Sequence, residues 1–248
     1  MSYRTLGVLL GAGIAAATLC GAPAFAADMP VKAEPLFNWT GWYICGNGGY
    51  SWGRVKEHFT STTSSYDVTT KVHGGEASAD GGYCWQTKST DYVYCLDVRY
   101  DFPHERGSTT TPALVPTNTT NQIGTFLIGP RAGFLTDRNL TLWYATGGLT
   151  LDDAKNVTSI PGDTATGTKT AWRAGFFVGA GVERMLDRHW SVKVEYDFEY
   201  YGSGGFSNTL SPCAGTTRCV AGTTPVVNVG KAYDNIIAAT IAYHFNSY

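Results

Sequence analysis

Carboxylates are the first residues whose type and spacing suggest chemistry. Glu195, Asp197 and Glu199 alternate with apolar residues, and Glu183 precedes them in the segment before. Catalysis by a carboxylate pair requires two groups whose surroundings separate their pKa values. No nucleophile elbow, His-Glu-x-x-His pair or Walker loop accompanies them. We therefore expect no catalytic site and interpret these carboxylates as part of an internal ion-pair network, because buried charges are tolerated when they are paired.

Histidine and cysteine are the other residue types that could hold a ligand. The five His and six Cys of the chain show no metal-ligand spacing and include no Cys-x-x-Cys pair. His189 and His244 could in principle reach a haem iron, but a solvated or hydrogen-bonded histidine is the simpler interpretation. We therefore expect no metal site, no cofactor-binding residue and no bound cofactor.

The carboxylates lie in segments whose residues alternate in character. In Tyr92–Phe102 every even-numbered residue is apolar or aromatic, and Asp97, Arg99 and Asp101 take odd positions. Trp190–Tyr200 repeats the pattern, with its charged residues again on the odd positions. Such alternation places the two sets of side chains on opposite faces of a β-strand.

Six further segments fit the two-residue period less sharply, which makes eight strands of about 11 residues, near the roughly 9 to 11 that a tilted transmembrane strand needs. The predicted strands are Trp42–Trp52, Gly74–Trp85, Tyr92–Phe102, Ile123–Phe134, Thr141–Leu151, Ala171–Glu183, Trp190–Tyr200 and Asn235–Phe245. The short connections are Gln86–Asp91, Thr136–Asn139 and Met185–His189, and the long polar ones are Arg54–Val72, Pro103–Gln122, Asp152–Thr170 and Tyr201–Asp234. This alternation is typical of outer-membrane barrels, which have short periplasmic turns and longer extracellular loops.

The placement of charge distinguishes a membrane barrel from a soluble barrel or sandwich. Soluble β-proteins turn their apolar face inward, whereas membrane barrels turn it toward lipid. Here the charged residues lie on the strands, and Trp and Tyr are concentrated at strand ends, as in the aromatic girdles of membrane barrels. We predict an all-β fold, an eight-stranded antiparallel transmembrane up-and-down β-barrel, with a soluble barrel or sandwich as the alternative.

Composition excludes a disordered chain and a nucleic-acid-binding protein. Only 15% of the 248 residues are charged, against roughly 25% in an ordinary soluble domain. The formal net charge of −2 gives no electrostatic footprint for nucleic acid.

The first residues are typical of an export signal. Arg4 precedes the apolar run Leu6–Leu19, and Ala24-Phe25-Ala26 has the small-x-small form of a cleavage site. We expect residues 1–26 to be a cleaved signal peptide, residues 27–38 a periplasmic leader and residues 39–248 the outer-membrane barrel. An uncleaved anchor helix is the alternative, although the apolar run is shorter than the roughly 20 residues that span a membrane.

Several stretches resemble one family, the porin-like, eight-stranded outer-membrane β-barrel proteins of Gram-negative bacteria, of the OmpA type. These stretches are Trp39–Tyr50, Tyr144–Leu149, Gly179–Glu183, Trp190–Tyr196 and Ala242–Phe245. The resemblance implies a location in the cell outer membrane. It also implies a terminal aromatic residue that acts as the assembly signal, either Phe245 or Tyr248. Some members of the family are described as haemin-binding.

We expect the protein to be a structural or porin-like barrel with a narrow polar lumen, and not an enzyme. Side chains fill the interior of an eight-stranded barrel, so a wide channel is not expected. The alternative is a surface binding protein, an adhesin or haemin-binding receptor that acts through its loops. The expected partner is outer-membrane lipid and not nucleic acid, while a homo-oligomer and an extracellular ligand are left open. The predicted lumen charge network comprises Asp97, Arg99, Asp101, Arg131, Arg173, Glu183, Lys193, Glu195 and Asp197.

Five cysteines follow the predicted signal peptide. Export to an oxidising compartment makes disulfides the default, and an odd number leaves at least one thiol unpaired. Cys213 and Cys219 lie close together in the last long loop, so we expect a small disulfide there. Cys84 and Cys95 stand opposite each other if their hairpin is symmetric, which makes them the second candidate pair. Cys45 is then the free thiol and faces the lumen, although its pairing with Cys84 or Cys95 is an open alternative.

Overall fold

The computed structural model describes residues 37–62, 65–87, 91–103, 106–109, 117–202, 206–216 and 219–245. All of them belong to the unit that spans Leu36–Tyr248. The predicted signal peptide, residues 27–36 of the predicted leader and Tyr248 lie outside the described residues. No helix in the described ranges is long and apolar enough to cross a membrane.

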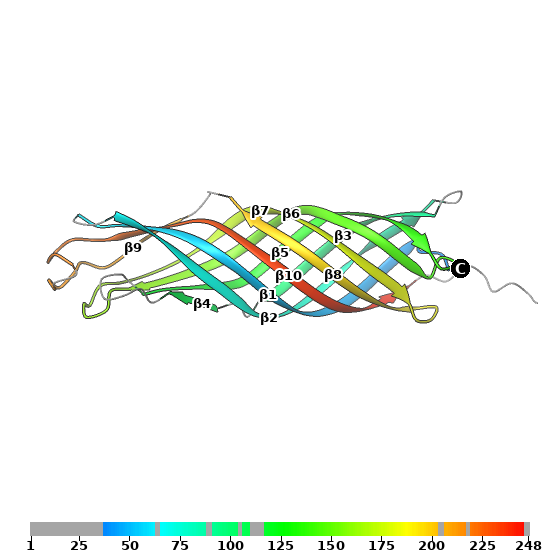
Figure 1. The fold of residues 1–248 in the computed structure, drawn as a ribbon, viewed down its shortest axis with the longest axis horizontal. Helices are drawn as coiled ribbons and strands as arrows, with labels where there is room; N and C mark the ends of the chain where they lie inside the picture. The colour runs from blue at the N-terminus through cyan, green and yellow to red at the C-terminus, as the bar shows by residue number, and fades with distance from the viewer. Residues whose placement is uncertain are drawn as a thin grey trace, which may run out of the picture. The chain divides into compact units, whose positions relative to one another are not determined.

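Eight long strands form one antiparallel sheet, and Figure 1 shows them crossing the barrel obliquely with β9 at one end. They are β1 (Gly41–Thr60), β2 (Ser65–Gln86), β3 (Tyr92–Pro103), β5 (Thr117–Thr136), β6 (Thr141–Ser159), β7 (Thr166–Met185), β8 (Trp190–Tyr201) and β10 (Val226–His244). The short strands β4 (Arg106–Thr109) and β9 (Ser207–Thr209) pair at the margins of this sheet. The ring closes because β1 pairs with both β2 and β10. The predicted eight-stranded up-and-down barrel is confirmed.

The two faces of each strand differ along the middle of the barrel as predicted. On β8, Lys193 and Glu195 are buried inside, whereas Val194 and Tyr196 are exposed outside. The same holds around the ring, and the outward apolar side chains form a band, here called the apolar band. It includes Ile44, Leu96, Ile128, Leu149, Val178, Val194 and Ile237. Apolar side chains outside and polar ones inside are the arrangement of a transmembrane barrel.

The predicted bounds of the four long loops are wrong. Strand pairing continues through much of Arg54–Val72 and Asp152–Thr170, and Pro103–Gln122 and Tyr201–Asp234 contain β4, β9 and the first residues of β5 and β10. The apolar alternation ends where the strand leaves the hydrocarbon. The backbone hydrogen bonds between neighbouring strands can continue beyond this point, because outward side chains that face water can be polar. Threonine and valine in these stretches also favour strands. The end of the apolar band is therefore not the end of the strand.

Beyond the apolar band the side-chain pattern inverts. On β1, Arg54 and Lys56 are exposed outside, while Val55 is buried inside. On β2, Lys71 is exposed and Val72 is buried in the same way. This part of the barrel follows the rule of a soluble β-protein, with its apolar face inward. We call this the outer end, and the inner end is the opposite one, where β5 and β6 are joined by a turn at residues 137–140.

Exchanging one outward residue for arginine should distinguish the apolar band from the outer end. Val194→Arg places a charge in the band and should cost about 2–4 kcal/mol, whereas Thr60→Arg, outward on the last residue of β1, should cost about 0–1 kcal/mol. The free energy of unfolding, from urea titration in phospholipid vesicles, measures both. Equal costs at the two positions would show that the band is not in hydrocarbon.

Candidate functional site

The lumen near the inner end is organised around Arg131. Its Nη1 lies 2.8 Å from Glu183 Oε2, and its Nε lies 3.0 Å from Asp97 Oδ2. Its guanidinium carbon is 5.1 Å from the Tyr43 ring centroid and 4.8 Å from the Tyr144 ring centroid. A desolvated guanidinium over aromatic faces gains cation–π stabilisation in addition to its ion pairs. Arg131 therefore bridges strands on different sides of the lumen.

Hydrogen bonds hold the carboxylates around Arg131 in place. Ser191 Oγ donates to Glu183 Oε1 at 2.6 Å, and His244 Nε2 lies 3.1 Å from the same oxygen. The Tyr43 hydroxyl donates to Asp97 Oδ1 at 2.5 Å. Charge-assisted hydrogen bonds are about twice as strong as neutral ones, so these contacts fix the orientation of both carboxylates.

Arg99 occupies the middle of the lumen and is surrounded by carboxylates. Its distances are 3.1 Å to Asp101 Oδ1, 2.9 Å to Glu195 Oε1, 2.6 Å to Asp197 Oδ2 and 3.5 Å to Glu199 Oε1. The planar guanidinium has five donors in a fixed fork, which lets one side chain reach several carboxylates at once. Three of these carboxylates come from β8, so Arg99 joins β3 to β8 through the lumen.

Lys193 joins the Arg99 group to Asp80, and Tyr144 links the Arg99 group to the Arg131 group. Its Nζ lies 3.0 Å from Asp80 Oδ2 and 4.0 Å from Glu195 Oε2. The Cys45 thiol contacts the other oxygen of Asp80, and the Tyr144 hydroxyl donates to Glu195 Oε2 at 2.6 Å. A void of about 20 Å³ lies between these side chains, which is room for about one water.

Two further groups continue the network toward the outer end. Arg173 Nε donates to Asp152 Oδ2 at 2.9 Å, and its guanidinium carbon lies 5.0 Å from the Tyr201 ring centroid. Glu57 accepts hydrogen bonds from Thr70 Oγ1 at 2.9 Å and Asn156 Nδ2 at 2.8 Å. Charged and polar side chains thus follow one another along the lumen.

An apolar cluster closes the inner end. Trp39, which precedes β1, is fully buried there; its indole Nε1 donates to the Asn139 carbonyl at 2.8 Å, and its backbone N–H donates to Gln86 Oε1 at 2.9 Å. The ring meets the His244 ring edge-on, with centroids 5.4 Å apart. The cluster comprises Trp39, Tyr43, Cys45, Cys84, Val93, Cys95, Leu135, Leu142, Tyr144, Met185 and Ala242.

Apolar side chains also fill the outer end. One cluster contains Val55, Val72, Tyr201, Val229 and Ala232, and the next contains Phe59, Ile160, Ala165, Leu210, Cys213, Cys219 and Val227. Asp163, in the connection between β6 and β7, joins this end together: it accepts hydrogen bonds from the amides of Ala214 at 3.0 Å and Ala165 at 3.1 Å. The Ala214 amide is the main cause that lowers the pKa of the Asp163 carboxyl.

The structure brings the nine residues of the predicted network into the lumen. Eight of them fall into the linked groups around Arg131, Arg99 and Lys193, and Arg173 lies apart from these with Asp152. Sequence reasoning missed Asp152, because it was placed in a loop, and it missed Tyr43 and Tyr144, because the predicted network was limited to charged residues. Strand parity was the available signal: Tyr43 and Tyr144 alternate with outward Trp42 and Trp143.

The structure also places the candidate cysteines and histidines. Disulfides join Cys84 to Cys95 and Cys213 to Cys219, and Cys45 is a buried free thiol. His189 stacks on Tyr243 with ring centroids 5.6 Å apart. In the described part of the chain, no group of three or more His, Cys, Asp or Glu is arranged to hold a metal ion.

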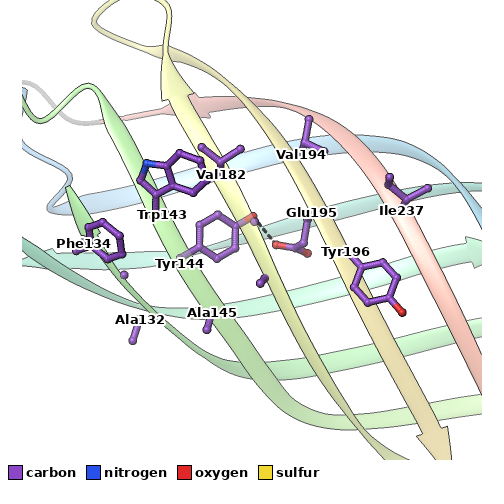
Figure 2. A pocket seen from close by; sticks show the side chains of 13 residues that line it. Ala132, Phe134, Trp143, Tyr144, Ala145, Val182, Val194, Glu195, Tyr196 and Ile237 are labelled. Atoms are coloured by element: carbon purple, nitrogen blue, oxygen red, sulfur yellow. Dashed lines mark hydrogen bonds between the residues drawn. The ribbon is translucent and has the colours of Figure 1, made fainter. Parts of the chain in front are cut away.

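A hollow of about 620 Å³ lies on the outward face of β5 to β8. Figure 2 shows Trp143, Val182 and Val194 around it, and shows Tyr144 directed toward Glu195. The hollow belongs to the apolar band, since its exposed lining includes Val194 and Ile237. A polar substrate would gain no hydrogen bonds there, so we do not interpret the hollow as a catalytic pocket.

Comparison with known proteins identifies the family of this chain. The model of the outer membrane protein beta-barrel domain matches residues 12–245. The 31 kDa outer-membrane immunogenic protein of Brucella melitensis biotype 1 is 30% identical over 207 residues, 73% of this chain and 82% of that protein. The 25 kDa outer-membrane immunogenic protein of Brucella canis is 28% identical, covering 86% of this chain and 91% of that protein. The crystal structure of OprG from Pseudomonas aeruginosa has a TM-score of 0.52 at 10% identity, covering 85% of this chain and 100% of that chain, a likeness of fold alone.

Removal of Arg131 should destabilise the barrel strongly, because Glu183 and Asp97 would lose their buried cation. Arg131→Met should cost about 3–5 kcal/mol. Arg184→Met, which breaks the exposed Arg184–Asp137 pair, should cost at most about 1 kcal/mol. Urea titration of the folded protein measures both, and Arg131→Met/Glu183→Gln should recover part of the loss. Similar costs for the two single variants would contradict an ionic role for the network.

The cysteine arrangement predicts a single reactive thiol. After denaturation without reductant, alkylation should label Cys45 alone, and mass mapping of the digest should show the Cys84–Cys95 and Cys213–Cys219 linkages. A peptide that links Cys45 to Cys84 or Cys95 would overturn this assignment, and five labelled cysteines would refute both disulfides.

Proposed function

The chain belongs to the outer membrane protein beta-barrel domain family, and from this premise we propose that it is a closed structural barrel rather than an open pore. It is an outer-membrane protein with a transmembrane β-barrel. The observation that carries the proposal is the Arg131 group, in which one guanidinium, two carboxylates and two tyrosine rings occupy the lumen at one level.

Closure at several levels supports the same proposal. The void of about 20 Å³ in the central network has room for about one water, and apolar clusters lie at both ends. A permeating ion would have to separate buried ion pairs and also cross an apolar cluster, both of which are costly. The network therefore acts as a filling that joins strands across the barrel. We propose neither an enzymatic reaction nor a cofactor for it.

We further propose that the inner end faces the periplasm and the outer end faces the exterior. Short turns and the first and last strand ends lie together at the inner end, as in outer-membrane barrels. The predicted signal peptide and leader agree with this orientation, because a leader that precedes β1 would start in the periplasm.

Surface recognition is the second candidate function. Its support is the ordered outer end, where Asp163 joins the β6–β7 connection to the disulfide-closed segment Cys213–Cys219. The two Brucella relatives are named immunogenic, and an outer end that faces the exterior would be open to recognition in the same way. A haem ligand inside the barrel is disfavoured, because His244 is buried against Glu183.

Planar-bilayer recording tests the proposed closure. The folded protein, identified by its heat-modifiable gel migration, should insert without stepwise conductance at neutral pH. Trp39→Ala and Trp39→Ala/Arg131→Ser should both remain silent, because the Arg99 group and the apolar clusters at the outer end still fill the lumen. Stepwise openings of the unmodified protein would refute the closed barrel and favour a pore.

A further inference from the structure

Four exposed cations lie together on the outward face of β10, β1 and β2, immediately beyond the apolar band. They are Arg54, Lys56, Lys71 and Lys231, here called the cation cluster. Arg54 stands directly opposite Lys71 in the β1–β2 register. Like charges directly opposite each other destabilise an antiparallel pair. The sheet therefore keeps a repulsive contact at this point.

A bulge adds a second contact of the same kind. The β1–β10 register shifts between Val55 and Glu57, so that Gly230 and Lys231 together stand opposite Lys56. Bulges redirect side chains, and here the bulge brings Lys231 beside Lys56. A Cβ on Gly230 would lie 3.1 Å from the Lys56 carbonyl oxygen, so the two strands approach closely. Both pairings concentrate positive charge on one small area.

The protein supplies no carboxylate to this cluster within the described ranges. None of the ion pairs there includes Arg54, Lys56, Lys71 or Lys231. Asp67, farther out on β2, lies 2.6 Å from His58 Nδ1 instead. Within the described ranges the cluster is therefore left open to an anion from outside the chain.

The position of the cation cluster along the strands indicates which kind of anion it would meet. Trp52 lies two residues before Arg54 on the same face of β1, and its ring stacks on Tyr50 with centroids 6.3 Å apart. On β10, Tyr233 lies two residues from Lys231 in the same direction. Interfacial Trp and Tyr rings mark the headgroup level. At about 3.3 Å per residue, Arg54 and Lys231 lie about 7 Å farther out along the strand than these rings, and Lys56 lies about 13 Å farther out than Trp52. The cluster is therefore on the water side of the rings, at the edge of the headgroup region.

We propose that Arg54, Lys56, Lys71 and Lys231 bind the phosphate groups of an anionic lipid in the outer leaflet. Arginine binds phosphate through two parallel hydrogen bonds, and the lysines add point charges. The leaflet assignment rests on the orientation proposed above, whereas lipid binding itself does not depend on the barrel being closed. Bound phosphate turns the repulsion between Arg54 and Lys71 into a bridged arrangement.

The test measures lipid retention on the full folded chain in non-ionic detergent by native mass spectrometry. The probes are diphosphorylated lipid A, its dephosphorylated form and inorganic pyrophosphate. Arg54→Gln/Lys71→Gln should weaken binding of diphosphorylated lipid A by about tenfold or more. Lys155→Gln/Lys169→Gln removes the same charge from the outer end of β6 and β7 and should leave the affinity within about twofold. High salt should reduce the difference, because exposed charges are screened.

A second measurement separates lipid binding from stability, because the effect of one substitution on the melting temperature should change sign when anionic lipid is added. Without anionic lipid, Lys71→Gln should raise the melting temperature or leave it unchanged, because it removes the repulsion from Arg54. With diphosphorylated lipid A the same variant should melt below the unmodified protein. Unchanged affinity of Arg54→Gln/Lys71→Gln, or equal binding of the dephosphorylated form, would overturn the proposal. Pyrophosphate binding as tight as that of lipid A would identify a site for free phosphate and overturn the lipid assignment.

Discussion

The structure depends on closure of the sheet, because backbone amides and carbonyls in hydrocarbon have no water with which to form hydrogen bonds. The pairing of β1 with β10, from Tyr43 opposite His244 to Thr60 opposite Val226, provides that closure. A ring of eight strands is narrow, so side chains must fill it. Polar groups in such a space must be paired. The lumen network is therefore a consequence of closing the ring in a membrane.

The two central arginines show why this network requires guanidinium groups. Arg131 is held by two carboxylates and two tyrosine rings, whereas Arg99 faces four carboxylates at once. The planar fork can direct several donors to different strands, and its face can stack on aromatic rings. Lys193, with one carboxylate at 3.0 Å, occupies a place where a point charge is sufficient. An Arg-to-Lys exchange at the two arginine positions would therefore not be conservative.

The two-residue period of the sequence predicted the ring and the inward face of each strand, but it did not predict the partners. Arg131 and Glu183 lie on β5 and β7, which are not neighbours in the sheet, and Arg99 reaches β8 from β3. Parity fixes the face of a side chain, whereas its level along the barrel depends on the register of every pair. Asp152 was missed for a different reason, because its strand was predicted to end with the apolar alternation at Leu151.

The inversion of the pattern explains why the strand ends were also misplaced. Within the band the surroundings are apolar outside and the lumen is polar, but beyond it water lies outside and apolar residues fill the interior. One strand therefore follows two opposite rules: on β1, apolar Ile44 is exposed and polar Ser51 is buried, whereas farther out Lys56 is exposed and Val55 is buried. A strand prediction that looks only for outward apolar residues therefore ends each strand at the edge of the apolar band. At that boundary the strand gains outward cations that no carboxylate of the described chain balances, and in our proposal lipid phosphate balances them.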